Sequence, residues 1–277
     1  MIQIKSDAEL ARMRRAGLVV ARCHAAVRDA LRPGITTFDL DELVENVIRE
    51  AGATPSFLGY GNPQAPFPAS ICASINEEVV HGIPSRERVL REGDVISVDI
   101  GAVLGGWHGD SAYTHVVGGL EVADETTRRL LQVCEDSLWA GLAAARQGGR
   151  LTDISAAVEG AVRPSGFGIV DHYGGHGIGS EMHQDPHLLN HGRPGRGPRL
   201  VAGMALAVEP MITVGSPETE ELDDEWTVVT ADRSRAAHFE HTVAITATGP
   251  WVLTAEDGGA ARLAALGVAM GGVSCGA

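Results

Sequence analysis

The sequence lacks paired cysteines, long apolar runs and an excess of positive charge. Its 4 cysteines show no CxxC spacing, which argues against a zinc ribbon or a disulfide framework and favours reduced, mostly buried thiols. No apolar run approaches the ~20 residues that cross a bilayer, and no signal peptide is evident, so we expect a cytoplasmic protein. The 36 acidic against 22 basic residues give a net charge of −14, which disfavours nucleic-acid binding through a general positive field.

Aromatic residues are also scarce, at 4% of the chain, so any that gather in one region merit a functional hypothesis. Hydrophobic residues make up 44% and charged residues 21%, which allows a sizeable core and excludes a disordered or fibrous chain. Because 277 residues do not by themselves require a division, we expect one domain over residues 1–257 and a loose Gly/Ala-rich tail over residues 258–277.

Hydrophobic periodicity predicts four helices, of which the first follows a capping box at Ser6. The expected helices span residues 7–32, 37–52, 124–147 and 153–163, and extended segments are expected near 204–209, 226–230 and 240–246. The apolar and charged spacing of Leu40–Gly52 recurs 114 residues later in Ile154–Gly166. A duplicated half-domain and a chance likeness of two amphipathic helices both explain this repeat. We expect an α+β fold with helices on one face of a sheet.

A hairpin is predicted over residues 95–117, which are rich in Val and Ile and are interrupted by Gly105-Gly106. With a two-residue turn, opposed residues have numbers that sum to 211. Asp99 then faces Ala112, and Asp110 lies two positions along on the same face. Two ionised carboxylates this close repel each other, and a divalent cation between them relieves the repulsion. A solvated carboxylate at a strand end is the alternative.

Three more polar residues stand beside glycines or at the ends of β-rich runs. His176 lies in Gly174–Gly179, where glycines allow close backbone approach. Glu209 follows an apolar run, and Glu240 opens another. Each residue alone is more often a loop imidazole or a solvated carboxylate, but with the two aspartates they offer one nitrogen and four carboxylates.

Such a ligand set suits a pair of Mn²⁺, Fe²⁺, Co²⁺ or Zn²⁺ ions bridged by carboxylates, whereas a structural zinc ion favours thiolates. Two ions ~3.5–4 Å apart can lower the pKa of a shared water and polarise a scissile carbonyl. Hydrolysis of a peptide or an ester is therefore the expected chemistry. We expect two divalent metal ions per chain and leave the element open.

The motifs, in their order and spacing, resemble the type I methionine aminopeptidases, a family with the pita-bread fold. The resemblance covers about residues 3–255 and rests on Ser74–Pro84, Asp94–Asp110, Gly175–Gly179, His183, Ala207–Met211 and Phe239–Thr242. Any one of these motifs is weak, whereas the ordered set is specific. The resemblance implies two related halves that form a curved antiparallel sheet covered by helices.

The resemblance also implies a role for each polar residue. The ligands of the two ions would be Asp99, Asp110, His176, Glu209 and Glu240, with Asp110 and Glu240 bridging. His81 would contact the scissile amide nitrogen, His183 would stabilise the oxyanion, and Glu209 would also move a proton from the water. The implied reaction removes the initiator methionine from new proteins with a small second residue. The expected partners are N-terminal Met peptides and nascent chains, with the ribosome as a further candidate, for a monomer without membrane or specific nucleic-acid partners.

For the methionine side chain, the resemblance implies a soft apolar pocket of limited size. Its walls would be Tyr60, Phe67, Cys72, Met182 and Trp226, together with the substrate-contacting His81 and His183. Phe57 marks a departure, because relatives have a small residue, often Cys, at this position. A second departure is the longer Pro-rich segment Asn62–Pro66. We expect both to narrow the rim and to limit large second residues.

Three other functions compete with this one. An Xaa-Pro aminopeptidase or prolidase shares the fold and ligands, and a creatinase-like amidinohydrolase is a similar rival, but both usually carry an extra N-terminal domain for which 277 residues leave no room. A non-catalytic binding module of the same fold is the third. Retention of all five ligand positions disfavours it, as does the charge of −14 if its partner is RNA.

Overall fold

The computed structural model describes residues 1–273. Its helices are α1 (Asp7–Ala30), α2 (Thr37–Glu50), η1 (Leu120–Val122), α3 (Glu125–Ala144), α4 (Leu151–Val162), η2 (Arg163–Ser165) and α5 (Ala260–Ala265). Its strands are β1 (Thr54–Pro55), β2 (Ile71–Ile75), β3 (Glu78–Val80), β4 (Val95–Leu104), β5 (Trp107–Val116), β6 (Gly168–Ile169), β7 (Gly175–Gly177), β8 (Gln184–Leu188), β9 (Ala205–Val208), β10 (Met211–Thr213), β11 (Thr219–Glu221), β12 (Val228–Thr230), β13 (Ala236–His238), β14 (His241–Thr246) and β15 (Gly249–Val252).

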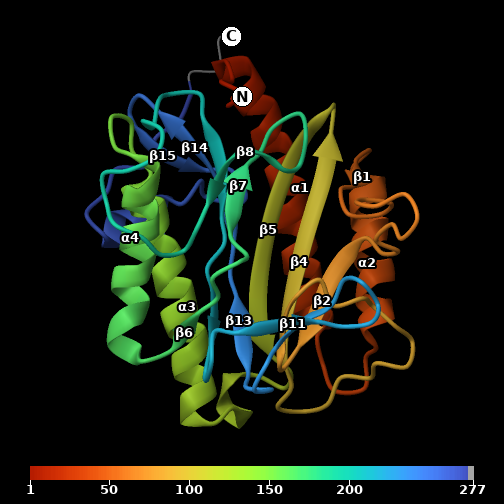
Figure 1. Cartoon of the computed structure of the whole chain (residues 1–277). Coiled ribbons are helices and arrows are strands. Elements are labelled where there is room, and N and C mark those ends of the chain that lie inside the picture. The colour runs from red at the N-terminus through yellow and green to blue at the C-terminus, as the bar shows by residue number, and fades with distance from the viewer. Residues whose placement is uncertain (274–277) are drawn as a thin grey trace.

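The long β4–β5 hairpin runs through the middle of the molecule, with α1 behind it (Figure 1). In one sheet β4 pairs with β1, β2 and β5, and in another the strand order is β15-β14-β9-β7-β8. The other two sheets within residues 1–273 have three strands each, in the orders β13-β10-β6 and β11-β12-β3. Helix α2 lies on one side of the hairpin, and α3 and α4 lie on the other (Figure 1).

The helix pairs α1–α2 and α3–α4 each pack around a separate hydrophobic core. Leu40 and Val44 of α2 are fully buried in one core with Val20 of α1 and Ile96 of β4. Helices α3 and α4 pack on the five-stranded sheet through a second core, formed by Leu130, Leu138, Ile154, Leu206 and Val243. This arrangement of helices against mainly antiparallel sheets confirms the expected α+β class.

The sequence repeat corresponds to α2 and α4, which are alike in burial and in how the chain leaves them. The first, fifth and ninth positions of each repeat are buried: Leu40, Val44 and Ile48 in one, and Ile154, Val158 and Val162 in the other. Gly52 (φ +70°) and Gly166 (φ +78°) then adopt the left-handed conformation that favours glycine. Equivalent positions of the two halves therefore share both a buried stripe and a backbone reversal.

The prediction of a loose tail from residue 258 is wrong for the part that the structure describes. Residues 260–265 form α5, and Leu263 and Val268 are buried in the core around α3. The Gly271 N–H donates to the Pro250 carbonyl at 2.8 Å. The high Gly and Ala content concealed two apolar anchors spaced five residues apart.

Two further sequence predictions concern the cysteines and membrane-spanning helices. Cys23, Cys72 and Cys134 are free and buried, as expected, while Cys275 lies outside the described residues. No helix within residues 1–273 combines the length and apolar character that crossing a bilayer requires.

Candidate metal centre and apolar pocket

The β4–β5 hairpin has the register that its sequence predicts. Asp99 pairs with Ala112 and Gly101 pairs with Asp110, across a turn at Gly105-Gly106. Because Asp99 and Gly101 are two residues apart, the two aspartates lie diagonally on one face of the hairpin. The prediction of neighbouring carboxylates is confirmed at the level of the backbone.

A second set of registers brings His176, Glu209 and Glu240 together. Strand β9 pairs Ala207 with His176 of β7 on one side and with Thr242 of β14 on the other. Val208 pairs with His241, and Met211 pairs with His238, so Glu209 lies opposite Glu240 in the gap between these pairs. Parity then places all three side chains on the same face of the sheet.

Backbone and hydroxyl contacts join this sheet to the hairpin. The N–H groups of Ala112 and Glu240 each donate to the other's carbonyl, at 3.3 and 2.8 Å. The Thr242 hydroxyl donates to the Asp110 carbonyl at 2.8 Å and accepts from the Asp110 N–H at 3.1 Å. The Ser111 hydroxyl donates to the Glu240 carbonyl at 2.7 Å. These contacts fix the hairpin carboxylates against those of the five-stranded sheet.

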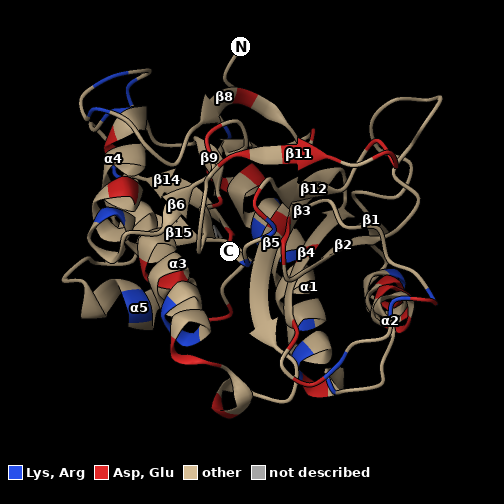
Figure 2. Cartoon of the chain, turned by 60° about the horizontal axis from the view of Figure 1, so that its bottom comes forward, with Lys and Arg blue, Asp and Glu red and all other residues tan. Residues whose placement is uncertain are grey.

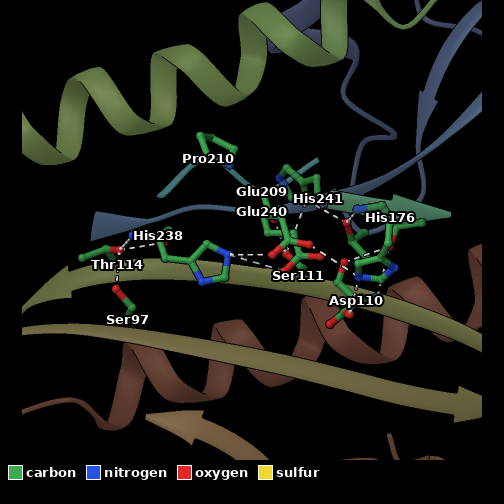
Figure 3. A network of polar contacts seen from close by, with 12 residues as sticks. Ser97, Asp110, Ser111, Thr114, His176, Glu209, Pro210, His238, Glu240 and His241 are labelled. Carbon is green, nitrogen blue, oxygen red and sulfur yellow. Dashed lines mark hydrogen bonds and ion pairs between the residues drawn. The ribbon is translucent and has the colours of Figure 1, made fainter. Parts of the chain in front are cut away.

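The side chains that meet at this junction form two overlapping groups of three donors (Figure 3). Ligand atoms of Asp110, His176 and Glu240 lie within 4.8 Å of one another, and so do those of Glu209, His238 and Glu240. Asp99 belongs to neither group, although its charge raises the pKa of Asp110 and its side chain lines the same cavity.

The chemistry of these donors fits divalent cations. Within residues 1–273, seven buried side-chain N and O atoms lack a hydrogen-bond partner, and four of them lie here: Asp99 Oδ1, Asp110 Oδ1, Glu240 Oε1 and His238 Nε2. Buried polar atoms without partners are costly, and a cation would satisfy several of them at once. The set of imidazole and carboxylate donors suits Mn²⁺, Fe²⁺, Co²⁺ or Zn²⁺.

Burial raises the pKa of every carboxylate in the cluster. The pKa of Asp99 rises to about 7, and that of Glu209 rises to about 8 because of burial and then the nearby charge of Asp99. The pKa values of Asp110 and Glu240 lie well above their usual range, because burial is reinforced by the neighbouring carboxylates. Without a cation, the protein therefore holds protons here at neutral pH.

His176 is prepared to offer its Nε2 atom to the cluster. Its Nδ1–H donates to the Gly177 carbonyl at 3.0 Å, which leaves Nε2 as the bare nitrogen. Nε2 lies 3.5 Å from Glu209 Oε1 and 3.9 Å from Asp110 Oδ2. Burial lowers the His176 pKa to about 3, so the ring is neutral. A Cβ atom at Gly175 or Gly177 would collide with a neighbouring carbonyl, which explains the flanking glycines.

His81 and His183 line the same cavity, outside both donor groups. His81 has a left-handed backbone (φ +61°), an uncommon conformation for a residue with a side chain and one found at functional sites. Burial lowers its pKa to about 4. The His183 ring lies 4.2 Å from that of His176, and its Nδ1 is 2.5 Å from the Tyr60 hydroxyl.

An apolar pocket opens beside the carboxylates in a cavity of about 810 Å³. Its predicted residues all line this cavity: Phe57, Tyr60, Phe67, Cys72, Met182 and Trp226. Phe67 is 2% exposed, and its ring contacts Phe57 and Trp226 edge to face at 6.3 and 5.2 Å. Burial and the nearby carboxylates keep the Cys72 pKa well above its usual range, so its thiol is neutral.

The Pro-rich segment Asn62–Pro66, which is longer than in the family, folds over Trp226. The indole N–H donates to the Ala65 carbonyl at 3.1 Å, and Gly61 approaches the indole so closely that a Cβ atom there would collide with it. The Phe67 N–H donates to the Tyr60 carbonyl at 2.8 Å and returns the chain to the pocket. The extra residues thus brace the tryptophan, while their effect on the rim stays a prediction.

Charge is distributed unevenly around this cavity. Acidic residues mark β11 and the turn after it, which leads to Trp226, whereas the helices carry both acidic and basic residues (Figure 2). The site therefore combines an acidic interior with an acidic segment near the pocket.

Sequence reasoning did not identify His238, and it named Thr242 only as part of a motif, without a role. His238 is 1% exposed, and burial lowers its pKa to about 3. The alternation of side chains along a strand could have indicated it, because residues 238, 240 and 242 of an extended segment all point to one face. The position of His238 two residues before Glu240 could have identified it.

Comparison with known proteins places the chain among metallopeptidases. Residues 11–247 match the profile of Metallopeptidase family M24. The chain is 56% identical over 256 residues to methionine aminopeptidase 1 of Mycobacterium tuberculosis, covering 90% of this chain and 94% of the relative. It is 52% identical over 254 residues to methionine aminopeptidase of Clostridium acetobutylicum, covering 92% and 99%.

Solved structures agree on the fold. Methionine aminopeptidase from Thermotoga maritima superposes with a TM-score of 0.88 at 42% identity, over 92% of this chain and all of the other. Prolidase from Pyrococcus furiosus gives a TM-score of 0.71 at 21% identity, and the match covers 91% of this chain but 65% of the prolidase. The second likeness shows the fold alone. Both comparisons confirm the expected pita-bread fold.

Proposed function

This chain belongs to metallopeptidase family M24, and we propose that within this family it is a cytoplasmic methionine aminopeptidase that removes the initiator methionine from peptides and nascent chains with a small second residue. One observation carries the proposal: an apolar pocket with polarisable walls shares its cavity with four largely buried donors, namely Asp110, His176, Glu209 and Glu240. The names of the relatives support it.

We assign the two-ion centre to Asp99, Asp110, His176, Glu209 and Glu240. When bound, the ions would polarise the scissile carbonyl, lower the pKa of a water and receive the free α-amine that limits cleavage to the first peptide bond. Burial and then the charge of Asp99 raise the Glu209 pKa to about 8 in the metal-free protein, and a bound cation would lower it. This behaviour suits a group that accepts a proton from water and returns it to the leaving amine.

The two imidazoles act on the reacting amide. A Tyr60 hydroxyl that donates to His183 Nδ1 leaves Nε2–H free to donate to the developing oxyanion. Burial keeps the Tyr60 pKa above its usual range, so the phenol stays protonated. His81, neutral at pH 7 because its pKa is about 4, is positioned by its strained backbone to contact the scissile nitrogen.

The apolar pocket selects the first side chain. Its rings and the Met182 side chain offer polarisable contacts that an unbranched thioether can fill. Phe57 occupies space where a small residue would leave room for the second residue of the substrate. We expect this constriction to make the preference for a small second residue stricter than in relatives with a small residue at this position.

A peptide panel tests the proposal. Protein stripped with a chelator and then given Co²⁺ or Mn²⁺ should release methionine from Met-Ala-Ser. It should leave N-acetyl-Met-Ala-Ser intact, because the free amine is blocked, and act far more slowly on Leu-Ala-Ser. Cleavage of Xaa-Pro peptides in place of Met-Ala-Ser would support a prolidase-like enzyme, and no cleavage with either ion would support a binding module.

A further inference from the structure

His238 has a fixed position and an unsatisfied ring nitrogen. Its backbone N–H donates to the Thr114 hydroxyl at 2.9 Å, and that hydroxyl lies 2.7 Å from the His238 carbonyl. The ring points at the carboxylates from the side opposite His176 (Figure 3). Nε2 is buried without a partner, at 3.8 Å from both Glu209 Oε2 and Glu240 Oε2.

Glu209 therefore lies between two imidazoles. Its Oε1 atom is 3.5 Å from His176 Nε2, and its Oε2 atom is 3.8 Å from His238 Nε2. The two donor groups share Glu240 but use different histidines. A cation beside His238 would thus occupy a different position from one beside His176.

The distances favour a shared cation over a direct hydrogen bond. At 3.8 Å, Nε2 and the carboxylate oxygens are too far apart to hydrogen-bond. Two ligands of one tetrahedral Zn²⁺ ion, each at ~2.0–2.1 Å, lie ~3.4 Å apart, which a small shift of the carboxylates would achieve. One nitrogen and two carboxylates suit Zn²⁺ or Co²⁺ better than Mg²⁺ or Ca²⁺.

We propose that His238, Glu209 and Glu240 form an additional, inhibitory position for a divalent transition-metal ion. Because two of its three donors, Glu209 and Glu240, also belong to the neighbouring centre, this position fills at higher ion concentration. An ion there takes Glu209 Oε2 and prevents Glu209 from moving a proton, so excess Zn²⁺ slows the reaction. Only the predicted inhibition rests on the proposed function, because the three donor side chains lie together whatever reaction the protein catalyses.

Anomalous diffraction locates the ion directly. Crystals soaked in excess Zn²⁺ and measured at the zinc edge should show a peak ~2.0–2.1 Å from His238 Nε2. The peak should be absent from His238→Gln crystals in the same soak. Peaks near His176 with none near His238, or an unchanged peak in the variant, would overturn the inference while leaving the proposed function intact.

Inhibition by excess Zn²⁺ gives a second readout. The Zn²⁺ concentration that halves Met-Ala-Ser cleavage should rise about tenfold in His238→Gln, a usual effect of losing a group from a metal site. His115→Gln is the matched control, since His115 also has a buried, unpartnered Nε2 but belongs to no donor group. Equal inhibition of all three proteins would contradict the inference. Absence of cleavage at every Zn²⁺ and Co²⁺ concentration would instead count against the proposed function.

Discussion

The carboxylate cluster and the apolar pocket share one cavity, but the chain builds them differently. The cluster residues lie on paired strands or directly between them, where register sets each side chain. Most pocket residues lie on connections: Phe57, Tyr60 and Phe67 between β1 and β2, Met182 between β7 and β8, and Trp226 between β11 and β12. Chemistry is thus placed on the rigid part of the fold, and selectivity on the part that tolerates changes in length.

This contrast predicts that substitutions in the cluster and in the pocket have opposite effects on activity and stability. In the cluster, replacing a carboxylate by an amide should abolish activity and yet spare the folded protein the cost of keeping a buried carboxyl group protonated. In the pocket, a substitution should alter the choice of substrate and remove apolar packing. Four experiments test the contrast, in order of decreasing effect.

Asp110→Asn should have the largest effect. Cleavage of Met-Ala-Ser should fall about 10³-fold or more, because Asp110 acts as part of a unit with Glu240 and His176. Without metal, the variant should melt at the same temperature as the parent or higher, since an amide is neutral in this buried cluster without having to bind a proton. A peptide-cleavage assay with Co²⁺ measures the first effect, and calorimetry without metal measures the melting temperature. Asp185→Asn, at an exposed rim residue, is the control, and a large metal-free destabilisation by Asp110→Asn alone would break the contrast.

His81→Ala and His183→Ala should each reduce turnover about 10²–10³-fold while the metal content stays at the parent level. The reason is that both rings lie outside the donor groups. Metal analysis after gel filtration, paired with kcat for Met-Ala-Ser, separates the two effects. Loss of metal in step with turnover would place these histidines among the ligands.

Above about pH 6.5, the stability of the metal-free protein should fall as pH rises to about 8. Below that pH the buried histidines act in the opposite direction, because their folded-state pKa values, about 3 for His176 and His238, lie below the unfolded value. The folded-state pKa values of Asp99 and Glu209, about 7 and about 8, exceed their unfolded values, so above about pH 6.5 the folded state binds more protons. The penalty is absent below the unfolded pKa values and complete above the folded ones. Chemical denaturation at several pH values measures it, and adding Co²⁺ at pH 7 should release protons. A stability that rises with pH above about 6.5 would contradict the assignment.

Phe57→Cys should have the smallest effect. We expect kcat/KM for Met-Thr and Met-Val peptides to rise up to about tenfold relative to Met-Ala, the effect of a few methyl groups of space in an apolar pocket. Phe167→Cys, in the core around α3, controls for the lost packing. Unchanged ratios among the three peptides would show that Phe57 does not set the rim.

The same contrast explains what could be predicted from the sequence. The hairpin register followed from Gly105-Gly106 alone, because a tight turn fixes the pairing of the strands that it joins. The meeting of β7, β9 and β14 depends on pairings between segments far apart in the chain, which local patterns do not specify. There local patterns marked His176, Glu209 and Glu240 only as candidates, and the family resemblance joined them into one site. His238 was overlooked because the relevant motif began at Phe239. In the tail, Leu263 and Val268 were hidden by Gly-rich and Ala-rich surroundings.

The two-residue turn of the hairpin also limits how this protein can vary. One residue inserted between Leu104 and Trp107 would rotate every following side chain of β5 to the opposite face, and would point Asp110 at α1 while leaving its chemical identity untouched. A library with single insertions and deletions along the gene should therefore contain inactive clones at this turn and active clones at Asn62–Pro66. The length of this turn, which carries no functional group of its own, is thus expected to matter for activity as much as a catalytic side chain does.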